Sequence, residues 1–257
     1  TEIYTLSLHD ALPICPVLVD STPPSCEVTV DKDHKVVLQA WQSGHYNVHS
    51  TTNSQTLDVN LPAPIELAGP WQITFPVRFG TGKQVNVDKL FSWNEHSDAD
   101  VRYFSGTAAY HSTFALQSKQ ENMRLYLDLG QVAIMAHVTL NGKELGTLWR
   151  APFRVDATDA LQIGENVLYV KVTNLWVNRQ IGDELLPEDS DRHANGTLKS
   201  WPQWVMENKP SPTGRTSFTT YRLWNRNDVP IESGLLGPVR LVAAQNVKLP
   251  DAHGPRP

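Results

Sequence analysis

The stretch LNGKELGTLWRAPFRVD, Leu140–Asp156, decides the fold of this chain. Its Asn141-Gly142 dipeptide accepts the positive φ angles of a primed two-residue turn, which joins two antiparallel strands. Val138 and Leu140 are expected to point into the core, and the return strand contains Leu145. We expect Trp149 and Phe153 to pack beneath the loop that follows. The stretch therefore predicts a β-hairpin.

The segments on either side of this hairpin alternate between apolar and polar residues. RLYLDLG (Arg124–Gly130) places three leucines on one face, and NVLYVKVTN (Asn166–Asn174) does the same with a leucine and two valines. A period of two is typical of a half-buried strand. Further strands, separated by Gly-containing turns, are expected at 71–75, 101–104, 108–116, 137–140, 217–223 and 239–243. The fold class is therefore all-β, an antiparallel jelly-roll β-sandwich.

A proline-rich connector, LPAPIELAGP (Leu61–Pro70), divides the chain into two parts. Proline stiffens a connector and interrupts strands. Residues 15–60 contain strand signals of their own and are expected to be the tail of a preceding β domain. Residues 61–245 are expected to form one complete sandwich.

The two ends of the chain are expected to lie outside these parts. The first segment, TEIYTLSLHDALPI (Thr1–Ile14), lacks the basic start of a signal peptide and looks like sequencing-adaptor read-through at the edge of a metagenomic gene. We expect residues 1–14 to be an artefactual leader that contributes nothing to the fold. Residues 246–257 are expected to be a flexible tail.

The composition excludes several classes of protein. The net charge of −5 and the pI near 6.0 argue against binding to nucleic acid or to anionic membranes. No apolar run approaches the roughly 20 residues that a transmembrane helix needs. Cys15 and Cys26 could form a disulfide, and neither has neighbours at the spacing of a zinc site.

The connection at residues 175–215 is unusually long. Connections beyond about 12–15 residues are usually functional or disordered. This one contains Trp176, Trp201 and Trp204, and aromatic side chains bury enough area to order a segment. We therefore predict an ordered surface that these tryptophans anchor on the sandwich, with a helical turn near Trp201–Met206.

Five carboxylates gather in this connection. They could supply the pair of acids that a glycosidase requires, or they could form a solvated acidic loop. They are Asp183, Glu184, Glu188, Asp189 and Asp191. The segment DSDRHANG departs from an EF-hand loop at several ligand positions, which leaves a structural calcium of another kind as an alternative. No cofactor is otherwise indicated.

Three tryptophans offer a second kind of site. Trp201, Trp204 and Trp224 could form a platform for sugar rings, or they could bury the connection against the sandwich.

Several motifs together resemble a known family. The run from Leu125 to Asn174 resembles the sugar-binding, galactose-binding-like jelly roll of family 2-type glycosidases. The motifs LAGPWQITF, DVRYFSGTAAY, TNLWVNRQIGD and SGLLGPVRL together resemble the C-terminal part of glycoside hydrolase family 106, the α-L-rhamnosidases. The likeness extends over about residues 36–243.

The resemblance implies an accessory domain. In that family the catalytic glutamates and the calcium belong to an N-terminal barrel-type domain, and nothing in this chain resembles a barrel. The chain is therefore expected to be a fragment without catalytic residues of its own, whose partners are that catalytic domain and a rhamnose-containing glycan. The full-length bacterial protein is expected in the periplasm or secreted.

The motif NLWVNRQIGD leaves the sandwich where the long connection begins, so its polar residues become candidates for a carbohydrate or interface patch. Arg179 could bind a sugar or a partner carboxylate, or it could form a clamp with Asp183. The candidates are Asn174, Trp176, Asn178, Arg179, Asp183, Trp201 and Trp204.

Three functions remain open. The chain could be the accessory domain of a rhamnosidase-like enzyme, a free-standing carbohydrate-binding module, or a small hydrolase that uses the acidic loop at 183–191. The first predicts a docking surface for a catalytic domain. The second predicts exposed aromatic rings, and the third predicts two facing carboxylates in a pocket.

Overall fold

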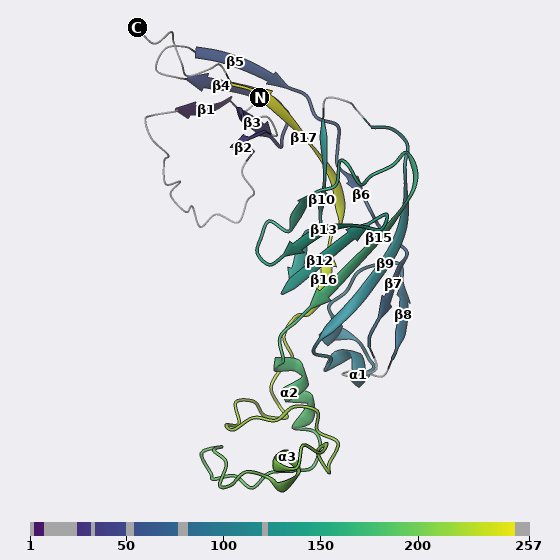
Figure 1. The fold of residues 1–257 in the computed structure, drawn as a ribbon, viewed down its shortest axis with the longest axis vertical. Coiled ribbons are helices and arrows are strands. Elements are labelled where there is room, and N and C mark those ends of the chain that lie inside the picture. The colour runs from purple at the N-terminus through teal and green to yellow at the C-terminus, as the bar shows by residue number, and fades with distance from the viewer. Residues whose placement is uncertain are drawn as a thin grey trace.

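The computed structural model describes residues 3–7, 25–31, 34–49, 54–76, 82–119 and 123–249. It confirms the expected all-β class, with two curled, mainly antiparallel sheets packed face to face (Figure 1). One sheet has six strands. Their order is β13 (Lys143–Leu148), β12 (Met135–Leu140), β15 (Gly164–Thr173), β9 (Thr107–Leu116), β7 (Trp71–Thr74) and β8 (Gln84–Val87).

The opposite sheet extends beyond the sandwich. Its order is β14 (Arg154–Asp156), β10 (Arg124–Asp128), β17 (Arg240–Lys248), β3 (Val36–Ala40) and β2 (Cys26–Val30), with β6 (Ile65–Glu66) also paired to β17. The first half of β17 pairs with β10 and the second half with β3. A short pair, β11 (Gln131–Ala133) and β16 (Gly234–Gly237), lies beside the sandwich.

The hairpin forms where it was predicted. β12 pairs with β13, and the turn residues Asn141 and Gly142 have φ angles of 51° and 78°. The Asn141 side chain also accepts a hydrogen bond from the Val167 amide at 2.8 Å and donates one to the Ala160 carbonyl at 2.8 Å. Asn141 therefore both makes the turn and ties it to the next strand.

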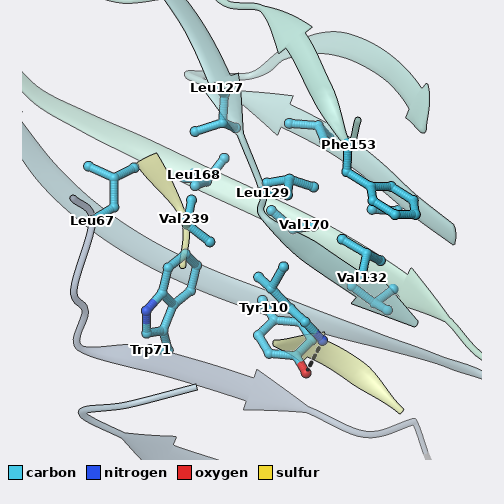
Figure 2. Packing of buried hydrophobic residues seen from close by; sticks show 14 of the residues in the cluster. Leu67, Trp71, Tyr110, Leu127, Leu129, Val132, Phe153, Leu168, Val170 and Val239 are labelled. Atoms are coloured by element: carbon cyan, nitrogen blue, oxygen red, sulfur yellow. Dashed lines mark hydrogen bonds between the residues drawn. The ribbon is translucent and has the colours of Figure 1, made fainter. Parts of the chain in front are cut away.

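The core lies between the two sheets. Figure 2 shows Trp71 and Tyr110 pointing into it, together with aliphatic side chains from both sheets. The Trp93 indole donates to the Tyr110 hydroxyl at 2.6 Å, and the Leu235 amide donates to the same hydroxyl at 3.0 Å. Burial raises the pKa of Tyr110, and the phenol therefore remains a neutral hydroxyl in the core.

Not every predicted position was right. Phe153 is buried, but Trp149 is 69% exposed, because it lies in the connection after β13 where no strand covers it. The predicted strand at 101–104 is instead helix α1 (Ala99–Arg102), preceded by η1 (Trp93–Glu95). Asp98 begins α1 by accepting a hydrogen bond from the Asp100 amide, which explains the helix. The predicted strand at 217–223 is irregular apart from an isolated bridge at Tyr221.

The first part of the chain has a second apolar cluster. It includes Leu38, Tyr46 and Leu57, and Val247 of β17 packs against it. Residues 246–248, predicted in a flexible tail, therefore belong to β17, because their backbone completes the pairing with β3. β17 thus links the sandwich to the preceding part (Figure 1).

A three-stranded sheet lies in the same part of the chain. Its strands are β1 (Ile3–Ser7), β4 (Gly44–His49) and β5 (Ser54–Val59). β1 belongs to the expected leader and pairs in parallel with β4. Cys15, and with it the disulfide alternative, lies outside the described residues.

Residues 175–232 form a lobe that projects from one end of the sandwich between β15 and β16 (Figure 1). It contains α2 (Val177–Asp183) and α3 (Gln203–Met206), and α3 confirms the expected helical turn. In the described part of the chain, no helix is long and apolar enough to cross a membrane.

Candidate functional site

The base of the lobe is held together by one asparagine. Asn178, on α2, donates from Nδ2 to the Ile231 carbonyl at 2.8 Å and to the Ser233 hydroxyl at 2.9 Å. Its Oδ1 accepts from the Ile231 amide at 2.8 Å. These bonds join the first helix of the lobe to its last residues, so the lobe leaves and re-enters the sandwich at one point.

Asn174 makes the matching connection on the sandwich side. Its Nδ2 donates to the Phe104 carbonyl at 2.9 Å and to Ser233 Oγ at 3.0 Å, and its Oδ1 accepts from the Gly106 amide at 2.9 Å. Both asparagines are buried. The structure thus uses these two predicted site residues to position the lobe.

Arg179 and Asp183 lie together on α2, as expected. Arg179 Nε lies 3.2 Å from Asp183 Oδ1, an ion pair without hydrogen-bond alignment. The other carboxylate oxygen, Oδ2, accepts from the Thr216 amide at 3.0 Å and from the Ser217 amide and hydroxyl at 2.7 Å each. Asp183 therefore fastens the return segment of the lobe to α2.

A network of arginines and glutamates fills the interior of the lobe. Arg215 Nη1 lies 2.8 Å from Glu184 Oε1, and Arg222 Nε lies 3.3 Å from Glu184 Oε2. Arg222 also pairs with Glu188, and Arg192 donates to the Thr219 carbonyl at 2.7 Å. Burial lowers the pKa of the Arg192 guanidinium. The network crosslinks segments that are far apart in the sequence.

The carboxylates of the acidic loop are therefore engaged in contacts with other residues of the lobe. Asp189 accepts from the Ser190 and Ser211 hydroxyls at 2.8 and 2.6 Å, and Asp191 lies 3.0 Å from Lys199 Nζ. Carboxylates whose oxygens already contact cations and hydroxyl donors of the lobe do not form a facing pair open to a substrate. Among the described residues, no group of three or more His, Cys, Asp or Glu side chains could hold a metal ion.

Two tryptophans of the lobe pack against the same aromatic ring. Trp204 packs edge-on against Phe218 with ring centroids 5.6 Å apart, and Trp201 lies 5.7 Å from the same ring. The Trp204 indole donates to the Asp189 carbonyl at 3.1 Å. The expected anchoring of these tryptophans on the sandwich is wrong, because Phe218 provides the packing partner within the lobe.

Trp201 and Trp204 line an open hollow of about 660 Å³, here called the tryptophan hollow. Trp201 is 58% exposed, so its ring is available to a ligand. The other lining residues are Asp189, Ser190, Asp191, Ser200, Pro202, Gln203, Glu207, Lys209, Pro210 and Pro212. An aromatic ring beside carboxylate, amide and hydroxyl groups suits a sugar, which has apolar ring faces and polar edges.

The remaining predicted tryptophans lie elsewhere. Trp176 caps the start of α2 and is 44% exposed, outside the tryptophan hollow. Trp224 lies against the buried ion network with Arg192 and Arg222. The arginines of this network were not among the residues predicted from the sequence, although opposite charges within one long connection are a signal of ion pairing.

Comparison with known proteins agrees with this architecture. Residues 83–201 match the family model described as glycosyl hydrolase 2 galactose-binding domain-like. A Formosa agariphila protein named "Putative beta-glucuronidase" is 48% identical over 184 residues, which is 71% of this chain and 16% of that protein. The structure of a rhamnosidase from Novosphingobium sp. PP1Y aligns with a TM-score of 0.57 and 25% identity, and the alignment covers 81% of this chain and 21% of the rhamnosidase.

The chain thus spans about a fifth or less of the length of these two relatives. The matched residues include the hairpin, the strands of the sandwich from β9 to β15, and the start of the lobe. The chain therefore has a galactose-binding-like fold, and over residues 83–201 it is similar to the galactose-binding-like domains of glycosyl hydrolase 2.

Proposed function

We propose that this chain is an accessory, carbohydrate-binding-type domain of a glycoside hydrolase, similar to an α-L-rhamnosidase, that supports a separate catalytic domain in the breakdown of plant glycans. The observation that carries this proposal is the tryptophan hollow. It presents an exposed Trp201 ring on a lobe whose base and interior are fixed by hydrogen bonds and ion pairs. A rigid aromatic ring beside polar groups is suited to bind sugar without ordering a flexible loop.

The rhamnosidase alignment supports the choice of enzyme class, since it extends over most of this chain at a TM-score above one half. The Formosa relative makes a β-glucuronidase the alternative class. Both relatives are about five times longer than the matched region or more, which leaves room for a catalytic domain. In that context the whole protein would be periplasmic or secreted and would act on a rhamnose-containing glycan.

The lobe is also suited to contact the catalytic domain. It projects from the sandwich (Figure 1), and Trp176, the residue before α2, is exposed. Arg179 lies in the same helix, but its pairing with Asp183 commits much of its charge to the lobe. Trp176 is therefore the better candidate for an interface residue.

The two competing functions differ in what they require. A free-standing carbohydrate-binding module would use the same hollow without a catalytic partner. A small hydrolase would need an acid that carries a proton, whereas Glu184 and Glu188 contact arginines. The accessory function and the free-standing module are therefore favoured over the hydrolase.

The test is a fluorescence titration of the chain with a rhamnosyl oligosaccharide. We expect the tryptophan emission to change on binding, and we expect Trp201→Ala to remove most of that change. Trp149→Ala is the matched control, because Trp149 is also an exposed tryptophan but does not line the tryptophan hollow. An unchanged response in Trp201→Ala would contradict the proposed site.

A parallel assay addresses catalysis. We expect no turnover of an aryl α-L-rhamnoside or an aryl β-D-glucuronide by the chain alone. Turnover that disappears in Glu184→Gln would support the small hydrolase instead.

A further inference from the structure

The outer face of the second sheet carries a polar groove. Strand β10 turns Leu125 and Leu127 toward the core, so Arg124, Tyr126 and Asp128 share the opposite face. Across the strand pairs, Tyr126 lies opposite Asp156 and Val242, and Asp128 lies opposite Arg154 and Arg240. Residues from three strands, β10, β14 and β17, thus meet on one surface.

Two hollows follow this surface. The Tyr126 hollow has a volume of about 730 Å³ and is lined by Thr29, Val30, Asp31, Val37, Gln39, Met123, Arg124, Tyr126, Asp156, Thr158, Asp159, Asn246 and Lys248. The Trp41 hollow has a volume of about 510 Å³. Its lining is Trp41, Gln42, Ser43, Leu61, Pro62, Ala63, Pro64, Asp128, Gly130, Arg154, Pro238, Arg240, Val242 and Ala243. Both volumes are within the usual range of small-molecule sites, about 300–1,000 Å³.

An aromatic pair separates the hollows. The rings of Trp41 and Tyr126 meet edge to face with centroids 4.6 Å apart, and the Arg154 guanidinium lies 4.2 Å from the Trp41 ring. Arg154 also donates two hydrogen bonds to Asp128 Oδ2, at 2.8 and 3.1 Å. The Trp41 ring is therefore held in one orientation on the sheet.

Amide and ionic contacts fix the other side of the pair. Gln39 Nε2 donates to the Tyr126 hydroxyl at 2.7 Å and to Asn246 Oδ1 at 3.0 Å. Arg124 donates to Asp156 Oδ2, from Nε at 2.6 Å. Surface ion pairs contribute little stability, so stability alone does not explain a network of this size. A preorganised set of rings, amides and ions is what a binding site requires.

We propose that the two hollows together bind a neutral oligosaccharide, with one part of the ligand on each side of the Trp41–Tyr126 pair. This inference rests on the proposed carbohydrate function and adds a second site to it. Arginine has five N–H donors and a carboxylate accepts several bonds, so both keep capacity for hydroxyl groups after pairing. Aromatic rings pack against the apolar faces of sugars.

The charges favour a neutral ligand. The Tyr126 hollow carries two cations and three carboxylates, whereas the Trp41 hollow carries two cations and one carboxylate. The groove as a whole has no net charge, so neither a polyanion nor a polycation gains a long-range attraction. The pairing of each arginine with a carboxylate also reduces its affinity for an acidic sugar.

The test is affinity electrophoresis of the Trp201→Ala chain in gels that contain soluble neutral arabinogalactan. The Trp201→Ala substitution removes the exposed ring of the tryptophan hollow, so the electrophoretic mobility of this variant measures binding in the groove. We expect arabinogalactan to retard the Trp201→Ala variant. We expect the double variant Trp201→Ala/Trp41→Ala to be retained at least about fivefold more weakly, because it has lost the aromatic contact of Trp41. Polygalacturonate is expected to cause at least about fivefold weaker retention, because the groove offers no net positive charge.

Substitutions at exposed residues test the groove without affecting folding. Lys248 lies at the rim of the Tyr126 hollow and is exposed, so Lys248→Ala in the same background tests the groove without a risk to the core. We expect it to weaken retention about twofold to threefold, the loss of one hydrogen bond to a hydroxyl. Lys143→Ala, in β13 on the other sheet, is the matched control and should leave retention unchanged.

The outcomes separate this inference from the proposed function. Loss of all retention in Trp201→Ala alone would overturn the groove and leave the proposed function intact. Equal retention with and without Trp41→Ala and Lys248→Ala would also overturn the groove. A tryptophan-emission response that is unchanged in Trp201→Ala, together with retained mobility shifts, would overturn the lobe site and support the groove, which contains Trp41.

Discussion

Asn178 and Ile231 exchange two hydrogen bonds across 53 positions of the chain, Nδ2 to carbonyl and amide to Oδ1, each 2.8 Å long. The side-chain amide of Asn178 thus pairs with the backbone of Ile231 in the way that a residue of a neighbouring strand would. The pairing brings the first and last segments of the lobe together. It converts a long connection into a closed unit, and the buried side chains of Asn178 and Asn174 together position that unit on the sandwich.

Asn178→Ala should open the base of the lobe. The substitution leaves the Ile231 amide without its partner, whereas the carbonyl keeps the Ser233 hydroxyl. A buried polar group left unsatisfied costs about 1–3 kcal/mol. We expect a lower free energy of unfolding in urea and faster amide exchange throughout residues 175–232. Asn227→Ala, an exposed asparagine of the same lobe, is the control and should change neither measurement.

Tyr110→Phe tests the polar contact inside the core. The hydroxyl accepts from the Trp93 indole and the Leu235 amide, so its removal leaves two buried donors unpaired. We expect a destabilisation of about 1–3 kcal/mol, seen as a lower melting temperature. Tyr169→Phe, on the exposed face of the first sheet, should melt like the wild type. Equal melting of the two variants would show that the core hydroxyl contributes nothing.

Gly130→Ala tests a close approach of two backbone segments. Gly130 has a φ of 65°, and a Cβ atom there would lie 2.5 Å from the carbonyl carbon of Gly237. Gly214 has a φ of 83° with no atom within 4 Å of such a Cβ. Gly214→Ala should therefore cost only the left-handed backbone strain, about 1–2 kcal/mol. Gly130→Ala should cost clearly more, and similar unfolding curves for the two variants would contradict the steric argument.

The pH dependence of stability can be tested at Asp156. Burial opposes its charge, but hydrogen bonds from Thr158 and from Arg124 outweigh this effect and lower the pKa of Asp156. A lowered folded-state pKa stabilises the protein above the unfolded pKa near 3.9, and this stabilisation is lost as the pH falls through the folded value. Asp156→Asn should thus be less stable than wild type at pH 7 and should match it progressively more closely below about pH 4. Melting curves between pH 7 and pH 3 measure this, with Asp191→Asn as the exposed control.

Deletion of residues 1–14 tests whether the leader belongs to the fold. The structure places β1 beside β4, at the edge of a three-stranded sheet. We expect the melting temperature of the sandwich to stay unchanged, because the described strand of this segment pairs with β4 in a sheet separate from the two sheets of the sandwich. A fall of several degrees would correspond to about 1 kcal/mol or more and would show that the pairing stabilises the chain.

Local patterns in the sequence determined the strands and their turns. The alternation in Arg124–Gly130 and Asn166–Asn174 predicted β10 and β15, and the Asn141-Gly142 dipeptide predicted the hairpin of β12 and β13. These signals work because the side-chain period and the φ preferences of Asn and Gly act within a few residues. The aromatic content of residues 175–215 likewise predicted an ordered segment, and the lobe confirms that prediction.

Only the tertiary structure decided where the lobe tryptophans pack and which polar residues meet. Trp201 and Trp204 share Phe218, and Gln39 reaches Tyr126 and Asn246 from strands that are far apart in the sequence. Trp149 is exposed because no strand happens to cover it. Each of these outcomes depends on contacts between distant segments, whose register and direction are set when the sheets pair. The composition of a short stretch contains no information about that pairing, so neither the tryptophan hollow nor the groove beside Tyr126 can be read from the sequence alone.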